Sequence, residues 1–370
     1  MAKRVLITGG AGFIGSHLAD ELLAHGHRVR ALDRLDPQVH PAGGRPEYLS
    51  PEVELVRGDV RDRDAVSRAL DGVDAVYHFA ARVGVGQSMY ELADYQSVNA
   101  HGTGVLLEAL LDRPVEKLVV ASSMSVYGEG AYVDAAGATA DACERTRTQL
   151  ERREWEPRGA AGAELRPVPT PETKPPALAS IYALGKYDQE RMCLIYGAAY
   201  DVPTVALRFF NVYGTRQALS NPYTGVLAIF ASRLLNGKPP LVFEDGQQRR
   251  DFVSVADVAR ACRLALEQTA ADGRVLNVGS GRSVSVLEIF DELRLALDVD
   301  AEAQLTGKAR AGDIRHCFAD IGLAQELLGY RPEVELGDGL RDLAQWLEGQ
   351  VAEDRVDTAA QELAARGLTL

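Results

Sequence analysis

The stretch Thr8-Gly9-Gly10-Ala11-Gly12-Phe13-Ile14-Gly15 decides the fold of this chain. It follows a short apolar run at 4–8 that is typical of a β-strand, and it leads into 16–25, where the leucines have helical spacing. The glycines permit a tight turn, close approach of the backbone to a pyrophosphate, and close packing of helix on strand. The stretch therefore predicts a strand–turn–helix unit that holds a dinucleotide at the helix N-terminus.

The next predicted strand ends at Asp33, which lies 18 residues after Gly15. A carboxylate here can accept a hydrogen bond from a ribose 2′-hydroxyl and repels a 2′-phosphate, so it favours NAD over NADP. The neighbouring Arg34 weakens that preference. Asp59, after the third strand, either accepts the adenine amino group or caps the following helix.

Small residues after the fourth strand, in His78-Phe79-Ala80-Ala81, would let the cofactor approach closely. We interpret His78 itself as a hydrogen-bonded core residue. The residues expected from this part of the chain to contact NAD are Gly9, Gly12, Phe13, Ile14, Gly15, Asp33, Arg34, Asp59, Val60, Phe79, Ala80 and Ala81.

Strand and helix patterns alternate through the first part of the chain. The predicted strands are 4–8, 28–32, 53–57, 75–79, 117–121 and 204–209. Such alternation is typical of parallel βαβ units, so we expect an α/β fold with a Rossmann-type doubly wound parallel sheet. After about residue 215 the rhythm changes to helices mixed with short strands, which predicts a smaller, mixed α/β C-terminal lobe.

Composition excludes several classes of protein. The 370 residues carry a net charge of −13, which disfavours nucleic acid as a partner because that affinity depends on clustered Lys and Arg. Four cysteines without a Cys-x-x-Cys pair indicate neither a disulfide framework nor a metal site. No apolar run is long enough to span a membrane. We therefore expect a cytoplasmic protein without metal.

Three side chains form a candidate proton-transfer site. Tyr182 and Lys186 lie four residues apart on a predicted helix and share one of its faces, and Ser123 follows the fifth strand. A nearby cation, either Lys186 or an oxidised nicotinamide, would lower the pKa of the phenol towards working pH. Ser123 could then hydrogen-bond the same substrate hydroxyl.

With these motifs the chain resembles the extended short-chain dehydrogenase/reductase family, and within it the NAD-dependent nucleotide-sugar epimerase/dehydratase branch. The resemblance covers roughly residues 3–349 except 129–178. The matching pieces are TGGAGFIG (8–15), Asp33, Asn99 in VNAHGT, SSMSVYG (122–128), YALGK (182–186), LRFFNVYG (207–214), RDFVSVADVARA (250–261) and RAGD (310–313). The resemblance implies that Asn99, Tyr182 and Lys186 also contact NAD.

The resemblance also implies a substrate site. Asn211 resembles the residue that contacts the sugar-nucleotide diphosphate, and Arg250 and Arg310 resemble its phosphate-binding arginines, with Asp313 or Arg315 assisting. Guanidinium groups suit phosphate because they bind it in bidentate geometry. The alternative for either arginine is a surface salt bridge. Ser123 is expected to contact the sugar.

The residues after Ser123 bear on the reaction. In the 4,6-dehydratases of this family an Asp-Glu pair follows the catalytic Ser or Thr, whereas this chain has Met124 and Ser125. Neither can supply acid and base for an elimination, and the Glu expected in decarboxylases is also missing. Epimerisation at C4 of a dTDP- or UDP-linked hexose is therefore favoured. A decarboxylase or keto-sugar-forming enzyme acting on an uronic acid or deoxysugar nucleotide, and a non-catalytic NAD sensor, remain alternatives.

The residues from 168 to 260 further resemble dTDP-L-rhamnose 4-epimerase-like proteins, a neighbour of the UDP-glucose 4-epimerase type. That subgroup has cysteine pairs in an insert, whereas this chain has only Cys143 there, so we expect the insert to be a mobile lid or an interaction flap.

The expected division is therefore a Rossmann domain at 1–214 with an irregular insert at 129–178, a nucleotide-sugar lobe at 215–350, and a tail at 351–370 containing an exposed amphipathic helix. The resemblance implies a homodimer formed by helices near 99–112 and 182–199. The apolar residues that could seat it, unless they belong to the core, are Leu106, Leu110, Met192 and Ile195.

Overall fold

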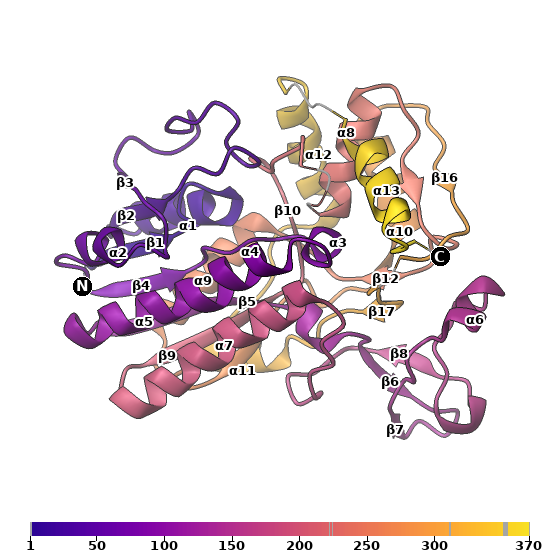
Figure 1. Ribbon diagram of the computed structural model, residues 1–370, viewed down its shortest axis with the longest axis horizontal. Helices are drawn as coiled ribbons and strands as arrows, with labels where there is room; N and C mark the ends of the chain where they lie inside the picture. The colour runs from indigo at the N-terminus through magenta and orange to yellow at the C-terminus, as the bar shows by residue number, and fades with distance from the viewer. Residues whose placement is uncertain (1, 222, 224, 311, 351–353, 370) are drawn as a thin grey trace.

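A seven-stranded parallel sheet forms the centre of the protein (Figure 1). The computed structural model describes residues 2–221, 223, 225–310, 312–350 and 354–369. The strand order is β14-β9-β5-β4-β1-β2-β3. The strands are β1 (Arg4–Thr8), β2 (Arg28–Asp33), β3 (Glu54–Arg57), β4 (Ala75–His78), β5 (Lys117–Ser123), β9 (Thr204–Phe209) and β14 (Val275–Val278). The first six coincide with the predicted strands, so the Rossmann-type α/β prediction is confirmed.

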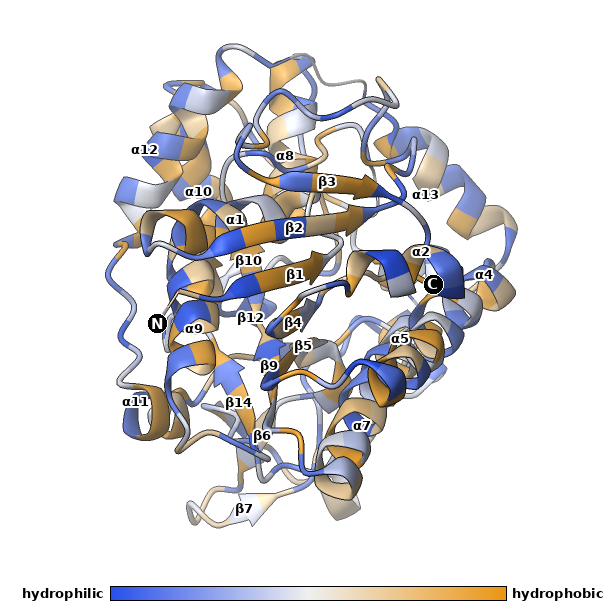
Figure 2. Ribbon diagram, turned by 90° about the vertical axis from the view of Figure 1, so that its left-hand side faces the viewer, coloured by the Kyte–Doolittle hydropathy of each residue, from blue (hydrophilic) through white to orange (hydrophobic). Residues whose placement is uncertain are grey.

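Helices cover both faces of this sheet, as Figure 2 shows with the strands seen between them. One face packs against α1 (Phe13–Ala24), α9 (Val255–Glu267) and α11 (Gly322–Leu328). The other packs against α2 (Arg63–Ala69), α5 (Gly102–Asp112) and α7 (Ile181–Tyr200). A parallel sheet buried on both faces needs continuous apolar strands, and Val5, Leu6 and Ile7 of β1 are all fully buried.

Short helices connect β4 to α5. They are α3 (Val85–Ser88), α4 (Leu92–Gln96) and a π-helical turn at Ser97–His101. The turn continues directly into α5, so the predicted helix over 98–112 is present with one irregular turn at its start.

The chain does not divide at residue 214. After leaving the sheet it returns to it: α9 packs on α1, and β14 pairs in parallel with β9 through Val275 and Ala206. The expected boundary between a domain at 1–214 and a lobe at 215–350 therefore needs correction. A local pattern predicts the strand at 275–278 but cannot tell which sheet it joins.

The second lobe is mixed α/β, as predicted. Its core lies between α8 (Val226–Leu235), α10 (Val286–Ala296) and α12 (Leu336–Leu347). Three small sheets belong to this lobe. One pairs β10 (Asn211–Tyr213) with β13 (Phe252–Ser254), and a second pairs β11 (Leu241–Val242) with β16 (Gln304–Leu305). In the third, β12 (Arg249–Arg250) lies between β15 (Val284–Ser285) and β17 (His316–Cys317).

The insert forms a small sheet of its own that projects away from the large one (Figure 1). It contains β6 (Ala131–Val133), β7 (Thr139–Ala140), β8 (Arg166–Val168), α6 (Arg147–Glu151) and a single 3₁₀ turn at 160–162. The base of the insert is fixed by Arg315, whose fully buried guanidinium pairs with Glu156 of the insert at 2.7 Å and with Asp245 at 2.6 Å. Arg315 is therefore an anchor of the insert and not the substrate-binding residue that we expected.

The C-terminal tail forms α13 (Val356–Ala365) beside the second lobe. The predicted helix is present, but the expectation that it is exposed is wrong for one of its faces, because Ala359 and Leu363 are only 7% and 6% exposed. No described helix is long and apolar enough to cross a membrane.

Gly15 is expected to tolerate no side chain. A Cβ there would lie 2.4 Å from the carbonyl oxygen of Gly9, because the first turn of α1, which contains Gly15, packs directly on the turn that follows β1. We expect Gly15→Ala to lose NAD during purification and to melt several degrees lower, measured by absorbance of the released cofactor and by calorimetry. Gly44→Ala is the control, because a Cβ there meets nothing within 4 Å. Equal behaviour of the two variants would contradict the prediction.

Candidate active site

A cavity of about 660 Å³ lies at the carboxyl ends of β1, β2, β4 and β5, and both lobes line it. Doubly wound sheets bind ligands at this edge. From the first lobe, the glycine turn, Asp33, Asp59 and Tyr182 line it, and from the second lobe the strand β10 and Arg250.

The glycine turn leaves the N-terminus of α1 open towards the cavity. Gly12 caps the helix without any side-chain hydrogen bond, and no acidic residue lies in the first turn. Gly9 has φ of +73°, and a Cβ on it would lie 3.0 Å from the backbone nitrogen of Ala80. Free N–H groups in a glycine cradle fit the pyrophosphate of a dinucleotide.

Two backbone hydrogen bonds orient the carboxylate of Asp33 at the end of β2. One carboxylate oxygen accepts from the backbone N–H of Ala11 at 3.1 Å and the other from Leu35 at 2.9 Å. No ion pair involves Asp33 within the described part of the chain. Arg34 instead pairs with Asp36 and lies 3.7 Å from Asp59, so its charge is already engaged. The arrangement suits a ribose diol and therefore NAD.

Asp59 also lines the cavity, and it does not cap the following helix. The cap of α2 is Asp62, whose carboxylate accepts from the N–H groups of Asp64 and Ala65. Asp59 accepts from the guanidinium of Arg61 at 2.6 Å. Burial would raise the pKa of Asp59, but the hydrogen bonds from Arg61 outweigh it and lower the pKa.

The other predicted cofactor residues divide into two groups. Those that line the cavity are Phe13, Ile14, Val60, Phe79, Ala80 and Ala81. Asn99 is buried behind it: its side-chain oxygen accepts from the backbone N–H of Arg82 at 2.7 Å, and its amide donates to the Arg82 carbonyl at 3.1 Å. Asn99 thus holds the loop after β4, and Arg82 itself lines the cavity although no sequence signal singled it out.

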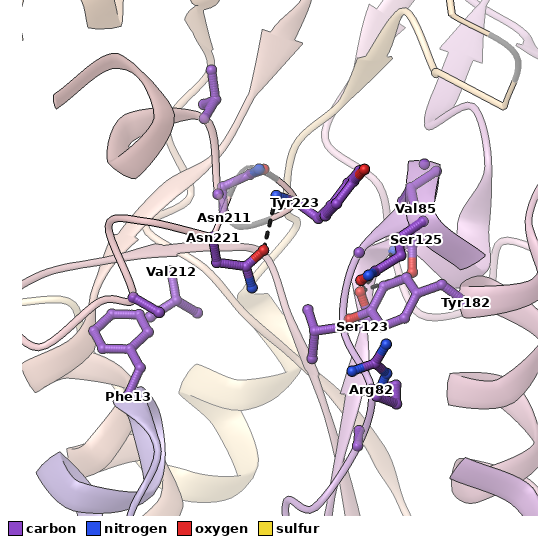
Figure 3. A pocket seen from close by; sticks show the side chains of 18 of the residues that line it. Phe13, Arg82, Val85, Ser123, Ser125, Tyr182, Asn211, Val212, Asn221 and Tyr223 are labelled. Carbon is purple, nitrogen blue, oxygen red and sulfur yellow. Dashed lines mark hydrogen bonds between the residues drawn. The ribbon is translucent and has the colours of Figure 1, made fainter. Parts of the chain in front are cut away.

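Ser123 and Tyr182 lie together at one side of the cavity (Figure 3). The hydroxyl of Ser125 donates to that of Ser123 at 2.9 Å, and Ser125 also lines the cavity. Burial raises the pKa of Tyr182, and a hydrogen bond with Ser123 acts in the opposite direction.

Lys186 belongs to a network of buried hydrogen bonds beside the cavity. Its Nζ donates to Gln189 at 2.7 Å, and Gln189 donates in turn to the Ala80 carbonyl at 3.1 Å and to Thr103 at 3.2 Å. Burial lowers the pKa of Lys186 to about 7, so its charge is easily lost. That Lys186, or else an oxidised nicotinamide, lowers the pKa of the phenol stays a prediction.

His78 is a core residue, as interpreted. Its Nδ1 lies 2.8 Å from the hydroxyl of Thr8 and its Nε2 lies 2.9 Å from that of Thr103. Burial lowers its pKa to about 3, so it stays neutral.

The helix that carries Tyr182 is fixed to the sheet by a buried ion pair that the sequence did not reveal. Glu190 of α7 accepts from two guanidinium nitrogens of Arg208 in β9, at 2.9 and 2.7 Å. It also accepts from Ser122, the neighbour of Ser123, at 2.6 Å. One carboxylate therefore joins the helix of Tyr182 to the strands β5 and β9.

Two predicted substrate residues offer unused polar groups. The side-chain oxygen of Asn211 is buried in the cavity wall without a hydrogen-bond partner among the described residues. Arg250 donates only to backbone carbonyls, those of residues 249, 314 and 315, so no carboxylate neutralises it within the described part of the chain. An unneutralised guanidinium in a cavity fits an anionic ligand.

Arg310 and Asp313 form the salt bridge that was the alternative for an arginine, with Nε to Oδ2 at 2.8 Å. Both nevertheless line the cavity, and the guanidinium of Arg310 lies 4.4 Å from the centre of the Phe243 ring. Phe243, Asn221 and Tyr223 line the cavity as well, although the sequence assigned them no role. Asn221 and Tyr223 are seen in Figure 3.

The fold and this site define a class of protein: a Rossmann-fold enzyme of the extended short-chain dehydrogenase/reductase type. Comparison with family models is more specific. Residues 5–149 and 159–279 match the NAD dependent epimerase/dehydratase family, and the chain belongs to that family.

Three similar proteins indicate which kind of enzyme within this family the chain resembles. The dTDP-L-rhamnose 4-epimerase of Burkholderia thailandensis is 35% identical over 93% of this chain and 95% of its own. The UDP-glucose 4-epimerase of Thermus thermophilus, solved in complex with NAD, is 33% identical with a TM-score of 0.75, covering 94% of this chain and all of its own. The UDP-glucose 4-epimerase of Thermotoga maritima, solved with UDP-glucose, is 31% identical with a TM-score of 0.76, covering 93% and 98%. This chain is an NAD-dependent nucleotide-sugar epimerase.

The displaced pKa of Lys186 predicts a pH-dependent stability. Between about pH 7 and pH 10.5 the unfolded lysine keeps a proton that the folded one has lost. The unfolding free energy of the NAD-free wild type should therefore rise with pH relative to Lys186→Met, by at most about 1.4 kcal/mol per pH unit. Urea unfolding at steps through this range measures it. Lys308→Met, at an exposed lysine, is the control and should follow the wild type. Parallel curves for wild type and Lys186→Met would contradict the assigned pKa.

Proposed function

We propose that the protein inverts the configuration at C4 of a dTDP- or UDP-linked hexose, with Tyr182 as the acid and base. The observation that supports this proposal most directly is the pairing of Ser123 with Tyr182 in a cavity that also contains a free amide oxygen and an unneutralised guanidinium. A proton-transfer pair and an anion site in one cavity suit a sugar joined to a diphosphate.

Tyr182 takes the proton of the C4 hydroxyl and returns it after the ketone has turned its other face. NAD in its oxidised form, when bound, would be the oxidant for C4 and would place a positive charge within the cavity. That charge favours the phenolate and offsets the burial that raises the pKa of Tyr182. One turnover causes no net oxidation of the sugar, because the hydride that leaves C4 is returned to C4.

Ser123 and Ser125 orient the reacting hydroxyl. Because Ser125 donates to Ser123, the Ser123 hydroxyl keeps its own proton for donation, either to Tyr182 or to the substrate oxygen. Such a donor stabilises a developing ketone oxygen. Lys186, held by Gln189 on the cofactor side of α7, is proposed to hydrogen-bond the ribose of NAD.

The residues after Ser123 disfavour the other reactions of the family. Met124 is buried in the cavity wall and Ser125 lacks an acid–base group, so neither can remove a proton from C5 or stabilise loss of water. Decarboxylation lacks its expected carboxylate at the same place. Epimerisation needs neither of these carboxylates, because Tyr182, Ser123 and NAD suffice for it.

The diphosphate is proposed to lie between Arg250 and Arg310, with Asn211 as an additional contact. Arg250 is the stronger candidate, because Arg310 must share its guanidinium with Asp313.

Replacing Tyr182 by Phe tests the acid–base role. The variant removes only the hydroxyl, so we expect NAD retention to be unchanged and kcat to fall about 10²- to 10⁴-fold. The assay follows interconversion of UDP- and dTDP-hexoses by NMR of the anomeric protons. Unchanged turnover by Tyr182→Phe, or no interconversion of any sugar by the wild type, would overturn the proposed function.

A homodimer through α5 and α7 is also proposed. These helices pack side by side on the same face of the sheet, and Ile195, Leu111 and Tyr200 project from them with exposed fractions of 59%, 48% and 58%. Two residues named from the sequence do not contribute, because Leu106 and Leu110 are fully buried in the core; Met192 packs at its edge.

Ile195→Asp is expected to weaken the dimer, because it places a charge in an apolar interface. Light scattering at micromolar concentration should give the mass of two chains for the wild type and a shift towards one chain for the variant. Leu295→Asp, at an equally exposed leucine of the second lobe, should remain dimeric. A wild type with the mass of one chain would exclude the dimer.

A further inference from the structure

The C-terminal helix α13 forms part of the wall of the active-site cavity. The side chains on one of its faces, with the last turn of the chain, line the cavity: Val356, Ala359, Ala360, Leu363 and Leu368. All five are apolar. The opposite face, represented by Gln361, is exposed.

The helix is fastened to both lobes. On the second lobe, Arg233 pairs with Asp357 at 2.6 Å and Lys238 pairs with Asp354 at 2.8 Å. On the first lobe, the guanidinium of Arg366 lies 4.4 Å from the centre of the Tyr90 ring. These contacts hold the helix across the opening between the lobes.

Leu363 marks the end of the cavity that α13 covers. A Cβ on Gly86 would lie 3.4 Å from the Leu363 side chain, so Leu363 rests against the turn that begins α3. The adjacent Val85 lies near Ser125 and Tyr182 (Figure 3). Leu363 therefore borders the catalytic groups, where the sugar must lie, whereas Leu368 lies at the other end of this wall, next to Thr369, which pairs with Arg310.

At this end of the cavity the described guanidinium groups are paired with carboxylates, and Lys186, which also lines the cavity, is held by Gln189. Arg82 lines the cavity, but Glu91 and Asp94 both pair with its guanidinium. Arg366 is directed onto Tyr90 and pairs with Glu362 at 2.7 Å. A carboxylate placed here would lose its hydration without gaining a partner.

We propose that α13 selects the sugar: Leu363 and its neighbours form an apolar wall that accepts nucleotide hexoses with an uncharged C6 substituent and excludes uronic acid nucleotides. This inference rests on the proposed function and narrows its substrate class. It assigns a specificity role to the tail, which lies outside the matched family region.

The test compares UDP-glucose with UDP-glucuronic acid, which differ only in CH₂OH against carboxylate at C6. Titration calorimetry on the NAD-loaded protein is expected to give at least about tenfold tighter binding of UDP-glucose to the wild type. Leu363→Lys should reduce that ratio by at least about tenfold, because it supplies the missing cation. Gln361→Lys adds the same charge on the exposed face and should keep the wild-type ratio.

Leu363→Ala serves as a milder variant in case the lysine disturbs folding, which NAD retention reports. It should weaken UDP-glucose about tenfold while the affinity for UDP alone stays within about twofold. Equal affinity of the wild type for both sugars, or an unchanged ratio in Leu363→Lys, would overturn the inference and leave the proposed function standing. Failure of the wild type to bind UDP or dTDP at all would overturn both.

Discussion

The buried pair between Glu190 and Arg208 is the interaction on which the active site depends. It ties α7 to β9, and the same carboxylate accepts from Ser122 in β5, so the helix of Tyr182 and the strand end of Ser123 are positioned by one group. Arg208 also lies 4.6 Å from the centre of the Tyr127 ring, which leaves the ion pair enclosed on all sides. Losing either partner would leave an uncompensated charge in the core, which typically costs about 3–5 kcal/mol. Catalytic geometry and stability are therefore linked at this point.

Local pairing with carboxylates also decides which arginines around the site can bind an anion. An acidic protein can offer a site to an anion when a few arginines are free of carboxylates, as Arg250 is, because it donates only to backbone carbonyls among the described residues. Elsewhere arginines are neutralised: Arg34 by Asp36, and Arg315 by three carboxylates. Net charge says little about such a site, since the local pairing decides which cation can meet a ligand.

The sequence predicted what local patterns control. The glycine turn, the six strands and the Tyr182–Lys186 face depend on spacing along the chain, and these appear as expected. Features that depend on contacts between segments far apart in the chain were not predicted. The return of β14 to the first sheet, the use of Asn99 to hold Arg82 and the anchoring role of Arg315 all depend on partners 17 to 159 residues away. The pKa of Lys186 belongs to the same group, because burial is a property of the folded chain.

The insert and the tail show most clearly what could not be predicted from the sequence, which is whether a segment lies at the active-site cavity. The insert was expected to be either a mobile lid or an interaction flap. No described residue of 129–178 lines the cavity, and buried charges hold the insert against the second lobe. The tail was expected to be exposed, yet it lies over the cavity. The residues 356, 359, 360 and 363 follow the spacing of an amphipathic helix whose apolar stripe needs a partner surface. Periodicity predicted that this stripe exists, but it could not say that the partner would be the active site. An apolar stripe that closes a catalytic cavity then affects which substrates enter, so specificity in this chain can depend on residues far from the motifs that define its family.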